Sequence, residues 1–259
     1  MSREPAKFVL SQSSRLHRNW GFPSLKKSSP IIKLWADLRP NRQGHKEERL
    51  KFRNIIWDVD GTLFDTYPGI TLAIKAALND LGKDAPLEWI SQLAKQSLNH
   101  CADVLTDKFQ LESDAFEQAL EKHFNLITIE ESPPFAGVIE LCQYICSIGG
   151  KNVIITHRGR KGTMDLLEGY DLEDYFSGVI TSDDGFPRKP DPAAFTAALE
   201  RFQLPLDETL TIGDREIDIQ AGQAAGLFSC FFGAGAEAVG ADLVISSFEE
   251  FHAYLLKSV

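Results

Sequence analysis

The second half of the chain alternates short apolar runs with amphipathic stretches, and this alternation constrains the fold more than any other feature. Apolar runs of strand length occur at 152–156, 178–181, 209–212, 228–232 and 242–245. Stretches with helical periodicity separate them, at 138–148, 159–167, 192–202, 216–225 and 248–256. Strands that alternate with helices form parallel sheets covered by helices on both faces. The sequence therefore predicts an α/β fold built on a doubly wound parallel sheet.

One more strand is expected before this half, and it ends in two acids. The apolar run 55–57 leads into Asp58 and Asp60, and Gly61 follows where the chain must turn. Open α/β sheets place their chemistry at the carboxyl ends of their strands. An Asp-x-Asp-Gly stretch also occurs in turns and calcium loops. Its meaning therefore depends on what the other strands bring to the same edge.

Residues 67–131 show helical periodicity and no strand pattern. Apolar residues recur at helical spacing between Ile70 and Leu81, and further helices are expected at 87–98, 102–109 and 116–124. We therefore predict an all-helical insert at 67–131 in a catalytic core made of 51–66 and 132–259. A polar break inside the insert suits either a loop that selects substrate or an ordinary solvated loop. Its residues are Lys95, Gln96, Ser97 and Asn99.

Residues 1–50 differ in composition from the rest of the chain. The first 53 residues hold 13 Lys and Arg against 4 Asp and Glu, whereas the remainder holds 14 against 33. We expect a basic, disordered N-terminal extension. A targeting peptide, an arm that binds nucleic acid or a membrane surface, and a misassigned translation start remain open alternatives.

Charge and composition exclude several classes for the core. Its acidic balance argues against nucleic acid as its partner. No apolar run approaches the roughly 20 residues that span a bilayer, so no membrane span is expected. The four cysteines form no C-x-x-C pair. Reduced thiols and a cytoplasmic location are therefore expected, while the oligomeric state stays open.

Polar side chains follow three of the predicted strands. Thr156 ends one strand and Asp214 ends another, with Asp218 four residues later, while Lys189 precedes a helix. In a parallel sheet these ends share one edge with Asp58, and several carboxylates there would repel one another without a cation. Mg²⁺ prefers such oxygen ligands and keeps water for a substrate. A hydroxyl and an ammonium at the same point suit a phosphoryl group.

Two carboxylates at such a site can divide a displacement at phosphorus between them. One can attack phosphorus and carry a covalent aspartyl-phosphate. The other can protonate the leaving alcohol and later activate water.

Four short motifs in the chain resemble those of the haloacid dehalogenase (HAD) superfamily. They are Asp58-Val59-Asp60-Gly61-Thr62, Thr156, Lys189 and Gly213-Asp214-x-x-x-Asp218. The resemblance covers about residues 53–257 and is closest to phosphoglycolate-phosphatase-like members, which carry a helical cap inserted after the first motif. It implies a HAD-like Rossmannoid core with the cap at 67–131.

The resemblance also implies roles for the acids. Asp58 would be the nucleophile and a metal ligand. Asp60 would be the general acid and base, and its backbone carbonyl would bind the metal. Asp214 would hold Mg²⁺, and Asp218 would support the metal's water shell or Lys189.

Two further residues would bind the phosphoryl group by the same resemblance. They are Thr156 and Lys189, and Lys189 would also neutralise the nucleophile. His157 and Arg158 follow Thr156 directly and suit either substrate contacts or loop surface. Asp183 and Asp184 suit either the site or a turn.

We therefore expect a magnesium-dependent phosphatase that acts on a small phosphorylated metabolite, with a phosphoglycolate-like monoester as one candidate. Dehalogenases of this superfamily lack the second acid that Asp60 provides. A sugar-phosphate mutase is one alternative, although residues 67–77 lack the histidine that the mutase motif contains. A non-catalytic regulatory or binding module on the same fold is the other alternative.

Overall fold

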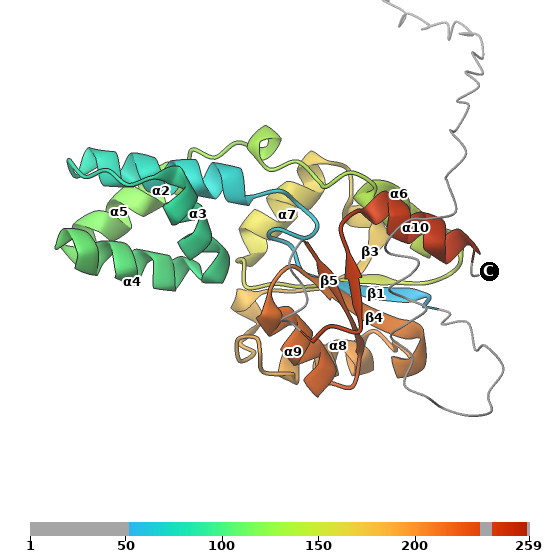
Figure 1. The fold of residues 1–259 in the computed structure, drawn as a ribbon. Helices are drawn as coiled ribbons and strands as arrows, with labels where there is room; N and C mark the ends of the chain where they lie inside the picture. The colour runs from blue at the N-terminus through green and yellow to red at the C-terminus, as the bar shows by residue number, and fades with distance from the viewer. Residues whose placement is uncertain (1–51, 234–239, 258–259) are drawn as a thin grey trace, which may run out of the picture. The chain divides into compact units, whose positions relative to one another are not determined.

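The computed structural model describes residues 52–233 and 240–257, and its centre is a six-stranded parallel sheet (Figure 1). The strand order is β3-β2-β1-β4-β5-β6. The strands are β1 (Asn54–Trp57), β2 (Asn152–Ile155), β3 (Phe176–Ile180), β4 (Thr209–Gly213), β5 (Phe228–Phe232) and β6 (Leu243–Ile245). This sheet confirms the predicted α/β fold. The expectation for residues 1–50 lies outside the described residues.

Strand β1 lies in the middle of the sheet and is buried along its whole length. It pairs in parallel with β2, where Trp57 lies opposite Ile154, and with β4, where Trp57 lies opposite Ile212. The strand order reverses direction between β1 and β4, so the crevice at their carboxyl ends is a topological switch point. Open α/β sheets bind their ligands at such a point.

Helices cover both faces of the sheet (Figure 1). Alternate residues of β1 serve the two layers, as the pleat of a strand requires. Ile56 belongs to a buried cluster with Phe195 and Ala221, whereas the ring of Trp57 packs against Phe248. The helices of this part are α6 (Val138–Ser147), α7 (Arg160–Gly169), α8 (Ala193–Arg201), α9 (Glu216–Ala224) and α10 (Phe248–Lys257). Short 3₁₀ turns lie at Ile129–Glu131, Glu173–Tyr175, Ser182–Asp184 and Leu206–Glu208.

Four of the five α-helices between β1 and β2 lie in residues 67–124, which we call the helical segment. They are α2 (Tyr67–Asp80), α3 (Leu87–Gln96), α4 (Leu98–Phe109) and α5 (Ser113–Phe124). Their apolar faces form a buried cluster that includes Ile74, Ile90, Leu105 and Phe116. Among the residues that the structure describes, no helix has both the length and the apolar character needed to cross a membrane.

One helix boundary differs from the sequence expectation. The periodicity predicts helices at 87–98 and 102–109, whereas α3 ends at Gln96 and α4 begins at Leu98. The single residue between them is Ser97, whose hydroxyl accepts the His100 N–H at 3.5 Å. A serine N-cap satisfies a free N–H of the first turn, so α4 can begin before its apolar stripe does.

Candidate active site

Three carboxylates meet at the carboxyl edge of β1 and β4. Asp58 follows β1, and its N–H donates to the Ile212 carbonyl of β4 at 3.0 Å. Asp214 follows β4, while Asp218 lies buried in the first turn of α9. One oxygen from each of these three aspartates lies within 4.8 Å of the others. The structure therefore brings together three of the acids that the sequence singled out.

Lys189 links two of these acids from below the surface. Its Nζ lies 2.7 Å from Asp58 Oδ1 and 2.7 Å from Asp218 Oδ1. The three side chains are 1–2% exposed. Burial favours the neutral amine, but the two carboxylates outweigh it and raise the pKa of Lys189. The lysine is therefore charged, and it fixes the position of Asp58.

The acids still hold more negative charge than Lys189 can balance. Burial, opposed by Lys189 and assisted by Asp218, raises the pKa of Asp58 to about 6. Burial raises the pKa of Asp214 well above its usual range, and the charges of Asp58 and Asp218 add to the shift. Asp58 Oδ2 and Asp214 Oδ1 are buried with no hydrogen-bond partner among the described residues. Unpaired carboxylate oxygens in this arrangement fit a divalent cation that prefers oxygen ligands.

Asp60 lies outside the acid cluster and faces two donors. Its Oδ1 accepts a hydrogen bond from Thr66 Oγ1 at 2.8 Å and from Arg158 Nη2 at 2.5 Å. Arg158 Nε also donates to this oxygen, at 3.1 Å. Burial alone would raise the pKa of Asp60, but Arg158 and Thr66 lower it. The sequence treated Arg158 as a substrate contact or loop surface, whereas the structure pairs it with Asp60.

The residues after β2 are held by hydrogen bonds to the chain around them. Thr156 is buried, and its Oγ1 accepts the Arg158 N–H at 3.1 Å. His157 Nε2 accepts the backbone N–H of Lys189 at 2.8 Å, and His157 Nδ1 lies 3.0 Å from Arg188 Nη2. Burial and the neighbouring cations, Lys189 first, lower the pKa of His157 to about 3.

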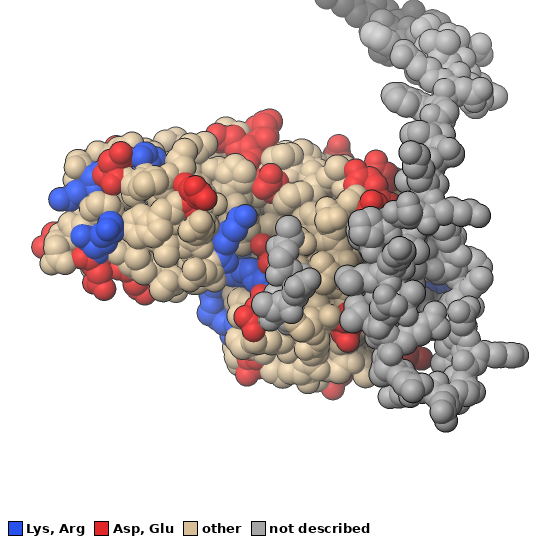
Figure 2. Space-filling model, viewed as in Figure 1, with Lys and Arg blue, Asp and Glu red and all other residues tan. Residues whose placement is uncertain are grey.

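Two cavities adjoin this edge. The first, which we call the nucleophile cavity, has a volume of about 1010 Å³ and is lined by Asp58, Asp60, Thr156, His157 and Arg158, together with Arg188 and helical-segment residues such as Ser97 and Asn99. Figure 2 shows Lys and Arg side chains gathered where the helical segment meets the rest of the described chain. The nucleophile cavity therefore joins the proposed chemistry to helical-segment side chains.

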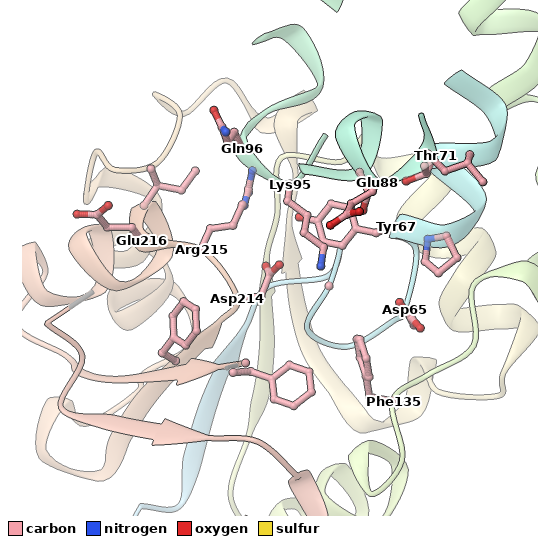
Figure 3. Close-up of a pocket in the computed structure, with 18 of the residues that line it drawn as sticks. Asp65, Tyr67, Thr71, Glu88, Lys95, Gln96, Phe135, Asp214, Arg215 and Glu216 are labelled. Carbon is pink, nitrogen blue, oxygen red and sulfur yellow. The ribbon is translucent and has the colours of Figure 1, made fainter. Parts of the chain in front are cut away.

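The second cavity, which we call the aromatic cavity, has a volume of about 1120 Å³ and reaches Asp214 (Figure 3). Its apolar wall includes Leu72, Leu87, Phe135, Phe231 and Phe232. In Figure 3 Lys95 extends from the helical segment and Arg215 from the start of α9. Tyr67 and Arg215 line both cavities. Asp58 and Asp60 line the first cavity only.

Sequence reasoning missed Tyr67, Arg215 and the steric role of Gly61. Gly61 has a φ of +76°, and a Cβ there would overlap the Asp214 carboxylate and the Tyr67 ring. Arg215 directly follows Asp214, and that position was the available signal for it. Asp183 accepts the Arg160 N–H at 2.8 Å and Asp184 pairs with the Arg160 side chain at 2.7 Å, so both acids hold the start of α7.

Known proteins are similar to this chain in sequence. A family model described as "Haloacid dehalogenase-like hydrolase" matches residues 55–232. A phosphoglycolate phosphatase of Thiobacillus denitrificans is 35% identical over 184 residues, which are 68% of this chain and 81% of that protein. A phosphoglycolate phosphatase of Nitrosospira multiformis is 31% identical over 189 residues, again 68% of this chain and 81% of the relative.

Solved structures show the same fold. A hydrolase from Streptococcus pneumoniae TIGR4 aligns with a TM-score of 0.52 at 31% identity and covers 69% of this chain and 91% of its own. A predicted phosphoglycolate phosphatase from Haemophilus somnus 129pt aligns with a TM-score of 0.69 at 22% identity. The alignment covers 79% of this chain and 98% of that protein. The second likeness concerns the fold alone.

Proposed function

The chain belongs to the haloacid dehalogenase-like hydrolase family and is a phosphatase-type hydrolase, and from this membership we propose a magnesium-dependent phosphatase that forms an aspartyl-phosphate on Asp58. Its substrate would be a small organic phosphate monoester. The relatives named phosphoglycolate phosphatase support a phosphoglycolate-like ester. We further propose that residues 67–131 act as a cap on a core of 51–66 and 132–259.

In the first step an oxygen of Asp58 attacks phosphorus while the bond from phosphorus to the ester oxygen breaks. Asp60, whose pKa Arg158 lowers in the substrate-free structure, would take up a proton from solvent as substrate binds and donate it to the departing alcohol, so the alcohol leaves neutral. The ammonium of Lys189, 2.7 Å from Asp58 Oδ1, keeps Asp58 ionised before the attack. The hydroxyl of Thr156 binds a phosphoryl oxygen.

In the second step water attacks phosphorus and the bond from phosphorus to Asp58 breaks, which releases inorganic phosphate. Asp60, deprotonated by the first step, accepts the proton of that water. Asp58, Asp214 and the backbone carbonyl of Asp60 would hold Mg²⁺, with Asp218 in support, and the ion supplies positive charge that offsets the charge of the phosphoryl oxygens. Closure of the cap would exclude bulk water from the covalent step.

The observation that carries this proposal is the buried contact between Asp58 and Lys189 beside Asp214. A carboxylate fixed by an ammonium on one oxygen, with its other oxygen unpartnered, suits a nucleophile with a vacant attacking atom. Asp214 adds the unpartnered oxygen that a cation needs. An ordinary buried ion pair would leave neither oxygen unsatisfied.

The variant Asp58→Asn tests the mechanism. Phosphate release from 2-phosphoglycolate in the presence of Mg²⁺ should fall by about 10⁴-fold or more, because removing a covalent nucleophile leaves only the binding groups. Asp207→Asn is the matched control. This exposed aspartate lies just before the amino end of β4, whereas the acid cluster lies at the carboxyl end. Magnesium-dependent phosphate release that survives in Asp58→Asn would contradict the mechanism.

We also propose a cytoplasmic location. The structure shows four free cysteines, at 101, 142, 146 and 230. Unpaired thiols are usual where glutathione keeps the compartment reducing. Fractionation of the native host, followed by immunodetection of this chain, tests the proposal.

A further inference from the structure

Arg188 lines the nucleophile cavity as an exposed cation. Other cations of that cavity are paired: Arg158 with Asp60 at 2.5 Å, Lys161 with Asp165 at 2.6 Å and Arg215 with Asp218 at 3.8 Å. Within the described part of the chain, Arg188 has no carboxylate within ion-pair distance. Its nearest polar neighbour is the His157 ring, with Nη2 to Nδ1 at 3.0 Å.

This neighbour cannot accept the hydrogen bond that Arg188 offers. His157 Nε2 already accepts the backbone N–H of Lys189 at 2.8 Å. The ring is neutral at ordinary pH, because burial and nearby cations lower its pKa to about 3. A neutral imidazole carries one proton, so that proton lies on Nδ1. Arg188 and His157 therefore face each other as two donors without an acceptor.

We propose that Arg188 and the Nδ1–H of His157 form a subsite for a carboxylate on the leaving group of the substrate. The proposal rests on the phosphatase function proposed above and deepens it. A carboxylate offers acceptor oxygens to both donors, and binding it would relieve the contact between them. The substrate class is then a phosphate monoester whose alcohol carries a carboxylate.

The neighbouring residue explains why this subsite holds the leaving group and not the phosphoryl group. Lys189 follows Arg188 in the chain and points inward, 2.7 Å from Asp58. Arg188 stays exposed at the cavity wall, whereas Lys189 is buried. The backbone bond from Lys189 to His157 holds the two donors at a fixed place relative to the nucleophile.

The test compares two esters that differ in the carboxylate, 2-phosphoglycolate and ethyl phosphate, each with Mg²⁺. In Arg188→Gln the ratio of kcat/KM for 2-phosphoglycolate to that for ethyl phosphate should fall about 10-fold or more, with the loss in KM, because a charged hydrogen-bonded contact is removed. Arg188→Lys keeps the charge without the planar fork and should recover part of the ratio. Arg201→Gln, an exposed arginine at the end of α8, is the control and should keep the wild-type ratio.

The outcomes separate this proposal from the phosphatase function. A wild-type protein that hydrolyses ethyl phosphate while Arg188→Gln keeps the wild-type ratio would overturn the subsite alone. Equal losses on both esters would place Arg188 at the phosphoryl group and would also overturn it. A wild-type protein that hydrolyses neither ester would contradict the phosphatase function and the subsite with it.

Discussion

The sheet edge and the helical segment use burial in opposite ways. At the edge, charged side chains are buried against one another: Asp58, Lys189 and Asp218 are 1–2% exposed. In the helical segment the buried side chains are apolar, and an ion pair such as Lys122 with Asp80 lies at the surface. A charge removed from water must be balanced by a specific partner, whereas an apolar side chain needs only neighbours of the right volume. The stability of the sheet edge therefore depends on individual charged partners, whereas that of the helical segment depends on how well its apolar side chains fill space.

The largest expected effect comes from removing the buried lysine. Lys189→Met should lower the free energy of unfolding by about 3–5 kcal/mol, because it leaves Asp58 buried without an ion-pair partner and Asp218 with Arg215 alone, at 3.8 Å. It should also abolish phosphatase activity. Guanidinium unfolding followed by circular dichroism measures the loss.

A matched change in the helical segment sharpens this difference. Lys122→Met removes a cation whose partner Asp80 is exposed to solvent, so little change in stability is expected. Adding Asp58→Asn to Lys189→Met should recover part of the loss, since one of the unpaired charges is gone. Equal losses in Lys189→Met and Lys122→Met would show that the two regions do not differ in this way.

A cavity in the helical segment should have a smaller and more local effect. Phe116 is 2% exposed and belongs to the buried cluster of the helical segment. Phe116→Ala should cost about 3 kcal/mol of local stability. Native-state hydrogen exchange should lose protection in α2 and α5 while β1 and β4 keep theirs. A uniform loss across the strands would mean that one cooperative unit contains both regions.

The smallest effect is expected from the half-buried imidazole of His157 at the edge. His157 has a pKa of about 3 in the fold, against about 6.5 in an unfolded chain. Between these values the unfolded chain binds a proton that the folded chain does not, so stability falls as the pH drops through this window. His157→Asn should therefore give a shallower loss of stability on acidification than wild type.

Urea unfolding between pH 7 and pH 4 measures the slope for His157→Asn. His100→Asn is the control, because that histidine is exposed in the helical segment. If His157→Asn follows the wild-type slope, the charged groups around the ring do not exclude its proton. The cations among those groups are Lys189, Arg188 and Arg215, whereas Asp218 opposes them and favours the proton.

The meeting of Asp58, Asp214 and Lys189 could be anticipated from the sequence, because parallel strands bring their carboxyl ends to one edge. The strand-length apolar runs and the residues directly after them carry that information. The partnership of Arg158 with Asp60 could not be anticipated in the same way. It depends on side-chain directions in two loops that follow different strands, and no periodicity encodes those directions.

The helical segment shows the same limit from another side. Its helices follow from an apolar stripe such as Ile70 to Leu81, yet the stripe does not report where helix ends lie or which polar residues face the core. Ser97 ended one helix and began another earlier than the stripe suggested. Tyr67 lines both cavities. The sequence pattern did not predict this position, because it depends on the tertiary structure.

The shared wall of Tyr67 and Arg215 has a consequence for how this catalytic edge can acquire new substrates. The two cavities, of about 1010 and 1120 Å³, have these two residues in common among their described lining. Because both side chains line both cavities, shortening one of them would enlarge the space between the cavity at Asp58 and the aromatic cavity. Under the proposed mechanism, Asp58 and Asp60 would then serve esters with a bulky apolar portion. A change of substrate would thus require one substitution, at Tyr67 or Arg215, and none in the residues that we propose break the phosphate ester bond.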